Sequence, residues 1–357
     1  MVENPYSRGG ECGYSHEVVR GILDPMTRPL VLITGGAGFL GTQLCRFLLA
    51  QGFAVRSVDI APSRLAEQAS FECIRGDIRD PVVVATAMRG VGYVVHAAAA
   101  DRAQPGDVIY STGVTGTWNV LQAAARSRVD RVVFLSSSAV YGAHEHHLMH
   151  EGDELLGKGP CAESKIEAES LCQGARLSGM CVPILRCADI VGPGSSGLYG
   201  QLFESAAAGR HFPIPGPGWR TCQVLDLDDV CDAVYQCLVI RAALVNDTFN
   251  LAARDFSTVR DCFQAVLDRA GHGRRVISLP RVLAAALAML GSSSPVPVVA
   301  DNALSVRHID NKLDFRARHL SHAALLRHYT GYLRMREPTA RRSPELTHSA
   351  RYEGVLP

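Results

Sequence analysis

This chain of 357 residues is 47% hydrophobic and carries 36 Lys and Arg residues against 35 Asp and Glu residues, a formal net charge of +1. That length and composition can bury the core of one large domain with a smaller attached lobe. The balanced charge gives no reason to expect nucleic acid or an anionic membrane as a partner, so we expect a small-molecule partner.

Eleven cysteines are spread along the chain without a C-x-x-C pair, and the N-terminus does not resemble a secretory signal. This pattern predicts reduced thiols in a cytoplasmic protein and not a disulfide framework. The longest apolar run, residues 282–290, is too short to span a bilayer and predicts a buried or amphipathic helix. We therefore expect a soluble protein.

Residues 1–28 show no sustained hydrophobic period, and we expect an N-terminal extension there. In residues 30–49 an apolar run gives way to three glycines and then to a helical pattern. Gly35 permits a tight turn, Gly38 lets the backbone approach a pyrophosphate, and Gly41 lets the helix pack on the strand. This strand, turn and helix predict a phosphate cradle.

The second strand, residues 54–59, ends in Asp59, which stands 18 residues after Gly41. A carboxylate at that place can accept a hydrogen bond from a ribose hydroxyl, which favours NAD over NADP. Two alternatives stay open. Asp59 could instead cap the next turn, and Arg56 or Arg64 could bind the 2′-phosphate of NADP.

With these elements the chain resembles the extended short-chain dehydrogenase/reductase superfamily, and within it the NAD-dependent epimerase/dehydratase family. The fingerprint is the glycine spacing with Phe39 and Leu40 inside it, and further matches extend to about residue 334. The resemblance implies that the glycine-rich stretch, with Phe39 and Leu40 in it, binds the cofactor. It identifies a scaffold that hosts many reactions, so the reaction has to be argued from the site.

The third strand is expected within residues 71–80, which resemble the family's third strand and the turn after it. The resemblance implies that Asp77 lies near the adenine of the cofactor, with Ile78 beside it. A structural role is also open, because an Asp in this turn could cap the helix that begins near Pro81, and both roles could hold together.

Residues 91–99 resemble the family's fourth strand, in which small residues, here Ala97 and Ala98, let the chain pass beneath the cofactor. We expect His96 in the same strand to be structural. The helix that follows also matches, except that Gly113 stands where the family has an asparagine. Because that asparagine organises a water-linked proton route in the family, its loss puts an ordinary proton relay in doubt.

The fifth strand, residues 131–135, runs into three serines followed by Val-Tyr-Gly. The resemblance implies that one serine hydroxyl hydrogen-bonds a substrate oxygen. Counting back four residues from Tyr141 selects Ser137, with Ser138 as its near neighbour. Adjacent serines can also simply end a strand, but the tail of this motif favours the functional interpretation.

Residues 143–151 contain four histidines and two glutamates, which are zinc-ligand types. Their spacing does not match a helix, and the resembling family has no metal at this place. We therefore predict an exposed polar loop and no metal site.

Residues 159–169 resemble the family's Tyr-x-x-x-Lys helix, with Cys161 in place of the tyrosine and Lys165 retained. Positions four apart share a helix face, so both side chains should point toward the cofactor. In the family the tyrosine transfers a proton and the lysine binds the nicotinamide ribose. A thiol is intrinsically more acidic than a phenol, so Cys161 could be the base, although its shorter side chain could need a bridging water. It could equally be a small buried residue, which would leave substrate, water or Glu163 to supply the proton.

Residues 182–194 resemble the sixth strand and the loop over the nicotinamide, and residues from about 195 to 223 should begin a substrate lobe. Nucleotide-sugar members of the family carry an arginine that clamps the diphosphate, and here its place is taken by Cys222. Either Arg220 substitutes for it, or the substrate is not a nucleotide sugar.

We predict an α/β fold, a doubly wound parallel (Rossmann) sheet with a smaller C-terminal α/β substrate lobe. Asp228 or Asp229 is expected to cap the helix at the Asp-Asp-Val turn. The expected domains are an N-terminal extension (1–28), a NAD(P)-binding Rossmann domain (29–194), a mainly substrate-binding lobe whose late segments return to the Rossmann domain (195–334), and a C-terminal tail (335–357).

The predicted function is NAD-dependent epimerase, dehydratase or oxidoreductase chemistry at a carbinol carbon of a sugar-like or natural-product substrate. Ser137, Cys161 and Lys165 are its candidate catalytic residues. One alternative, favoured by Cys222, is a steroid-dehydrogenase-like oxidoreductase acting on an apolar alcohol. Another is a dinucleotide-binding sensor or scaffold without chemistry, which Gly113 and Cys161 allow. The resemblance also makes a homodimer an expectation, because family members often pair through two helices of each subunit.

Overall fold

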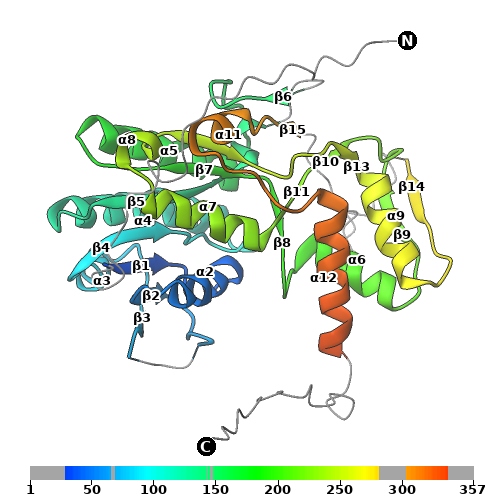
Figure 1. Ribbon diagram of the computed structural model, residues 1–357, viewed down its shortest axis with the longest axis horizontal. Helices are drawn as coiled ribbons and strands as arrows, with labels where there is room; N and C mark the ends of the chain where they lie inside the picture. Colours follow the sequence, from blue (N-terminus) through cyan, green and yellow to red (C-terminus); the bar gives the residue numbers. More distant parts are fainter. Residues whose placement is uncertain (1–28, 66–68, 143, 145–147, 281–302, 337–357) are drawn as a thin grey trace, which may run out of the picture.

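A computed structural model describes residues 29–65, 69–142, 144, 148–280 and 303–336 of the chain (Figure 1). Its central element is a parallel sheet with the strand order β12-β7-β5-β4-β1-β2-β3. The strands are β1 (Leu30–Thr34), β2 (Val55–Asp59), β3 (Phe71–Arg75), β4 (Val91–His96), β5 (Arg131–Ser137), β7 (Ile184–Cys187) and β12 (Thr248–Leu251). The strand order reverses between β1 and β4, which places a switch point at their carboxyl ends. The predicted doubly wound α/β fold is confirmed.

Helices cover both faces of this sheet. Along β1, Val31 and Ile33 belong to one buried cluster and Leu32 to the other, which is why the strand is apolar at successive positions. One face is covered by α2 (Phe39–Ala50), α7 (Leu227–Val239), α8 (Ala242–Val245) and α11 (Arg307–Leu313). The other face is covered by α3 (Pro81–Ala87), α4 (Gly106–Arg126) and α5 (Pro160–Leu177).

A second lobe with its own buried cluster lies beside the sheet in Figure 1. It contains α6 (Gly197–Ala207), β9 (Phe212–Pro215), β10 (Thr221–Cys222), β13 (Ser257–Thr258), α9 (Val259–Ala270), β14 (Val276–Leu279) and α12 (Ser321–Arg336). Two short parallel strands, β8 (Asp189–Val191) and β11 (Val224–Asp226), join the sheet to this lobe. In sequence β12 lies between β10 and β13 of the lobe, and α11 lies between β14 and α12, so the chain passes from the lobe to the sheet and back more than once.

The predicted cap of α7 is wrong by a few residues, whereas an Asp does cap α3, as the sequence left open. α3 is capped by the carboxylate of Asp80 and not by Asp77. α7 is capped by Asp226 and not by Asp228 or Asp229, which lie in its first turn. The capping carboxylate has to be in the residue just before the helix, where the backbone is still extended.

Part of the predicted loop at residues 143–151 is a strand. β6 (Leu148–Met149) pairs in parallel with β15 (Ala303–Leu304), and Met149 is fully buried, because its apolar side chain joins the core. Residues 145–147 of this segment lie outside the described residues, as do residues 1–28, 282–290 and 337–357. None of the described helices is both long and apolar enough to cross a membrane.

Candidate active site

The glycine-rich turn lies between β1 and α2 at the switch point. Gly35 has φ +74°, a left-handed conformation that favours glycine. A Cβ at Gly41 would lie 1.9 Å from the Gly35 carbonyl oxygen, so the helix start packs directly on the turn. Gly38 is the exposed N-cap of α2. The first-turn amides of α2, with Phe39 and Leu40 among them, are therefore open to an anion, and the cradle fits a pyrophosphate.

Asp59, at the end of β2, holds its carboxylate against this cradle. Its Oδ2 accepts a hydrogen bond of 3.0 Å from the amide of Ala37, and its Oδ1 accepts one of 2.9 Å from the amide of Ala61. Arg56 is occupied elsewhere, by Glu72 and two backbone carbonyls. Of the two arginines that the sequence offered to a 2′-phosphate, only the exposed Arg64 therefore stays a candidate, and the arrangement favours NAD.

Asp59→Asn should weaken NADH binding by about tenfold and NADPH binding less, because the amide loses the charge that holds a ribose hydroxyl and repels a 2′-phosphate. The measurement is fluorescence titration of the two reduced cofactors. Asp130→Asn, an exposed substitution just before β5, is the matched control and should leave both affinities unchanged. Equal losses of NADH and NADPH affinity in the Asp59 variant would contradict the assigned role.

The end of β4 passes directly under the cradle. A Cβ at Gly35 would lie 2.8 Å from the Cα of Ala98, and the amide of Ala98 donates to the Oγ1 of Thr34 at 3.2 Å. His96 is fully buried between the hydroxyls of Thr34 (2.6 Å) and Thr117 (2.9 Å). Burial lowers the pKa of His96 to about 3, so it stays neutral. The described contacts of His96 are structural. Ala97 and Ala98, whose side chains are small, pack directly against Gly35 of the glycine-rich turn.

Asp77 and Ile78 follow β3 on the adenine side of the predicted site. Asp77 accepts hydrogen bonds from the amide and guanidinium of Arg79, at 2.8 and 2.6 Å. These hydrogen bonds lower the pKa of Asp77. The loop is fixed by Asn119 of α4, whose amide donates to the carbonyls of Ile78 and Arg79 at 3.0 and 2.9 Å. Sequence reasoning did not single out Asn119, although it belongs to the matched helix motif.

The three serines after β5 have different surroundings. Ser136 is buried and donates to Glu169 at 2.5 Å, so it is part of the interior. Ser137 is the N-cap of the short helix η2 (Ser138–Tyr141), and its partly exposed hydroxyl accepts from the Ala139 amide at 3.2 Å. Because the Ser137 oxygen only accepts in this contact, its O–H can still donate a hydrogen bond to a substrate oxygen. This supports the sequence-based choice of Ser137 among the three serines.

Lys165 and Cys161 lie on α5, and both side chains are partly buried. The Lys165 Nζ donates to the Leu135 carbonyl at 2.7 Å and lies 4.7 Å from the centre of the Phe134 ring. Burial lowers the pKa of Lys165. Since Leu135 stands two residues before Ser137, the structure brings Lys165 to the same end of β5.

Cys161 is the second residue of α5, after the N-cap Gly159. The segment before the helix is tied to η2, because the Gly157 amide donates to the Val140 carbonyl at 2.9 Å. Cys161 therefore starts a helix anchored beside the Ser137 turn. Glu163, the other proton source considered, accepts from the Gly159 amide at 3.1 Å and thereby caps the helix.

Gly113 departs from the family pattern for a visible reason. A Cβ there would lie 2.7 Å from the Cβ and 2.8 Å from the Oγ of Ser164, because α4 and α5 pack closely at this point. An asparagine could not be accommodated without moving one helix. The packing of α4 on α5 therefore leaves no room at position 113 for the asparagine that organises water in the family.

A buried polar network that sequence reasoning missed lies behind α5 and β5. Arg186 and Glu169, both almost fully buried, form an ion pair of 2.7 Å. The Arg186 guanidinium also donates to the Tyr141 hydroxyl at 2.9 Å, and that hydroxyl donates to the Asn250 Oδ1 at 2.7 Å. The available signal was a charged residue inside the apolar strand at Ile184–Cys187.

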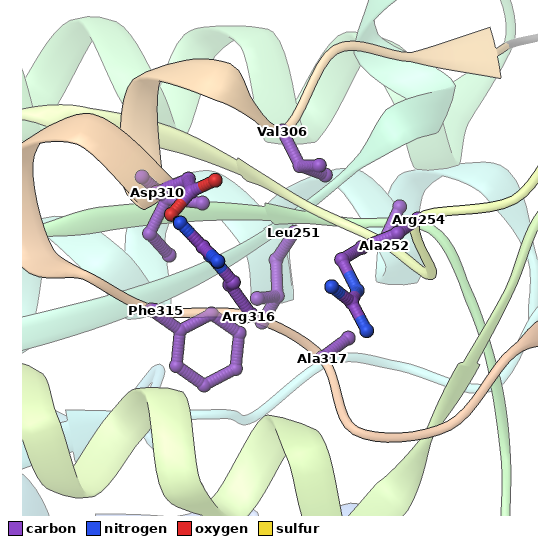
Figure 2. Close-up of a pocket in the computed structure, with 9 residues that line it drawn as sticks. Leu251, Ala252, Arg254, Val306, Asp310, Phe315, Arg316 and Ala317 are labelled. Carbon is purple, nitrogen blue, oxygen red and sulfur yellow. The ribbon is translucent and has the colours of Figure 1, made fainter. Parts of the chain in front are cut away.

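Figure 2 shows a small pocket at the carboxyl end of β12, lined by residues of β12, α11 and the segments beside them. Arg316 reaches Asp310 across it at 2.8 Å. None of the predicted site residues lines this pocket. It lies two strands from Ser137, since β7 separates β12 from β5.

Residues 31–252, more than half of the chain, match the NAD dependent epimerase/dehydratase family. The chain is 30% identical over 270 residues to the uncharacterized protein y4nG of Sinorhizobium fredii, covering 74% of this chain and 67% of that protein. It is 33% identical over 232 residues to a 3 beta-hydroxysteroid dehydrogenase/Delta 5-->4-isomerase of Mycobacterium tuberculosis, covering 61% of each chain.

Among solved structures, the chain is similar to the Bordetella bronchiseptica enzyme WbmG in complex with NAD and UDP. The TM-score is 0.73 at 21% identity, and the match covers 88% of this chain and 96% of that one. This likeness establishes the fold independently of the sequence match.

Proposed function

The chain belongs to the NAD-dependent epimerase/dehydratase family, and on that premise we propose that it is an NAD-dependent oxidoreductase acting at a carbinol carbon of a sugar-like or natural-product substrate. The observation that carries the proposal is the convergence of Ser137 and Lys165 at the carboxyl end of β5, with the glycine cradle across the switch point. Ligands of open α/β sheets bind at such a place. Membership of this family identifies the chain as an enzyme.

Family membership implies a role for each candidate residue, and the surroundings of these residues support it. The cradle and Asp59 hold the pyrophosphate and one ribose, and Lys165 orients the nicotinamide ribose. The Ser137 hydroxyl hydrogen-bonds the substrate oxygen. Cys161, directly or through a water, moves the proton of that oxygen. NAD, when bound, supplies the hydride chemistry that no side chain can.

A steroid-dehydrogenase-like oxidoreductase is the second candidate, and one observation favours it. Cys222 stands where the nucleotide-sugar members carry their clamping arginine, and it is buried in the lobe core. A hydrogen bond with Cys262, together with burial, raises the pKa of the Cys222 thiol. Position 222 therefore faces the interior of the lobe and offers no cation to a diphosphate. A relative that shares 33% identity is named a steroid dehydrogenase.

The experiment is to purify the full chain, measure its NAD affinity, and follow both nicotinamide absorbance and chromatographic conversion of substrate with two panels of substrate. One panel contains UDP-glucose and dTDP-glucose, and the other contains 3β-hydroxysteroids. Net reduction of NAD, or conversion of the substrate without net reduction as in an epimerase or dehydratase, supports the proposal when one panel gives it, and that panel selects the substrate class. Tight NAD binding with no turnover on either panel, and with no copurifying small molecule that is turned over, would favour a sensor or scaffold instead.

We also propose a homodimer formed through α4 and α5, which pack on each other along one face of the sheet. Tyr110 and Trp118 on α4 are 43% and 50% exposed, and aromatic residues are enriched at interfaces. Trp118→Glu should convert the dimer to a monomer, measured by light scattering after size exclusion. Trp219→Glu, at a 78% exposed tryptophan of the lobe, is the control. A monomeric parent protein, or equal dissociation by both variants, would contradict this interface.

The cytoplasmic location also remains a proposal. The ten described cysteines are free thiols, and seven of them are buried. Reduced thiols packed in the interior are typical of proteins in a reducing compartment.

A further inference from the structure

Asp189 begins β8, immediately beyond the sheet strand that neighbours Ser137. In the parallel register of β5 and β7, Ser137 lies opposite Cys187. The Ala188 amide continues the ladder by donating to the Leu251 carbonyl at 2.8 Å, so the chain is still extended there. With a rise of about 3.3 Å per residue and about 4.8 Å between strands, Asp189 stands roughly 8 Å from Ser137.

The segment after Asp189 runs toward the cofactor cradle. A Cβ at Gly192 would lie 3.0 Å from the Cζ of Phe39, which opens α2 in the cradle, and 2.5 Å from the Leu227 side chain. Asp189 therefore stands at the carboxyl edge of the sheet, beside the serine end of the site, and the segment that it begins leads from there toward the pyrophosphate end. The same segment leads into α6 and the lobe.

The Asp189 carboxylate is exposed but held in place from one side. Tyr199 of α6 donates its hydroxyl to the Asp189 Oδ2 at 3.2 Å. The Tyr199 ring is buried in the lobe core, edge-on to Phe263 with ring centres 6.4 Å apart. Burial, and after it the Asp189 carboxylate, raise the pKa of Tyr199 well above its usual value, so the phenol stays a donor. Among the described residues no hydrogen bond reaches the Oδ1 of Asp189, which leaves that oxygen to a ligand.

We propose that Asp189 determines substrate class: its carboxylate accepts a hydrogen bond from a hydroxyl of a substrate bound at Ser137, and it disfavours substrates that carry a nucleoside diphosphate. A carboxylate oriented by a neutral phenol is a good acceptor for a hydroxyl. The same charge repels a diphosphate. The inference rests on the proposed location of the substrate site, and it selects an uncharged hydroxylated substrate over a nucleotide sugar.

The test is the affinity of the full chain for UDP, measured by calorimetry in the presence of NAD. Asp189→Asn keeps the shape and the Tyr199 contact but removes the charge, and it should raise UDP affinity about tenfold. Glu204→Gln on α6 is the matched control, because it removes an equal charge from an exposed residue paired only loosely with Arg210 at 3.7 Å. The control should leave UDP affinity unchanged.

Equal UDP affinity in the parent and the Asp189 variant, including no detectable binding to either, would overturn the proposal, as would an equal gain in the Glu204 variant. Tyr199→Phe retains the charge and should keep UDP binding as weak as in the parent protein. NAD affinity is measured separately for every variant. If the parent protein did not bind NAD, the proposed function would be contradicted. The UDP titration would then be repeated without NAD, and it would still show whether Asp189 excludes a diphosphate.

Discussion

Cys161→Ala should slow turnover by about 10²–10⁴-fold while leaving NAD affinity nearly unchanged, because a proton-transfer group is removed while the cradle and Lys165 remain. The thiol lies at the second position of α5, at a helix start anchored to the Ser137 turn. The measurement is kcat and kcat/KM as a function of pH. The parent protein should show a pH-dependent limb that the alanine variant lacks.

Two further variants separate catalysis from packing. Cys161→Ser keeps the size of the side chain but is a far weaker acid, so it should restore little activity. Glu163→Gln is the control for a nearby acid, and it should retain activity because the Glu163 carboxylate caps α5 through the Gly159 amide. Parent-like rates and pH profiles in both cysteine variants would exclude the thiol. Proton transfer would then belong to the substrate or water, with Ser137 and Lys165 as the remaining pair.

Arg186→Met should lower the free energy of unfolding by about 3–5 kcal/mol, because it leaves the Glu169 carboxylate buried without its partner. It also removes a donor to the Tyr141 hydroxyl, which is itself buried. The measurement is urea unfolding followed by circular dichroism. The double variant Glu169→Leu/Arg186→Met should recover part of the loss, since no unpaired charge remains.

Arg210→Met is the control for removal of an arginine, because its pair with Glu204 is exposed at the surface of the lobe. It should shift the unfolding midpoint far less than Arg186→Met. Two outcomes would contradict this prediction. One is an equal loss of unfolding free energy in Arg186→Met and Arg210→Met, and the other is a double variant that is no more stable than Arg186→Met alone.

Local patterns were sufficient for the elements that we propose to bind the cofactor. The strand, turn and helix at the glycines are encoded by residues close in sequence, because a left-handed glycine and a helix start are properties of a few consecutive positions. The same holds for Ser137 at a strand end and for the shared face of Cys161 and Lys165. Cap assignments were less secure, as Asp80 and Asp226 show, because several acids in a row satisfy the same pattern.

The sequence by itself thus determined the family, the doubly wound sheet and the positions of the cradle and of the α5 pair, since each depends on periodicity or on short motifs. Only the tertiary structure showed that Arg186 forms its ion pair with Glu169 and that Tyr199 donates a hydrogen bond to Asp189. Only the tertiary structure showed, too, that Ser164 leaves no room for a side chain at position 113. Each of these contacts joins different elements of the fold. No local pattern specifies such a partner, because the choice depends on how strands and helices are stacked and on which polar groups that stacking buries together.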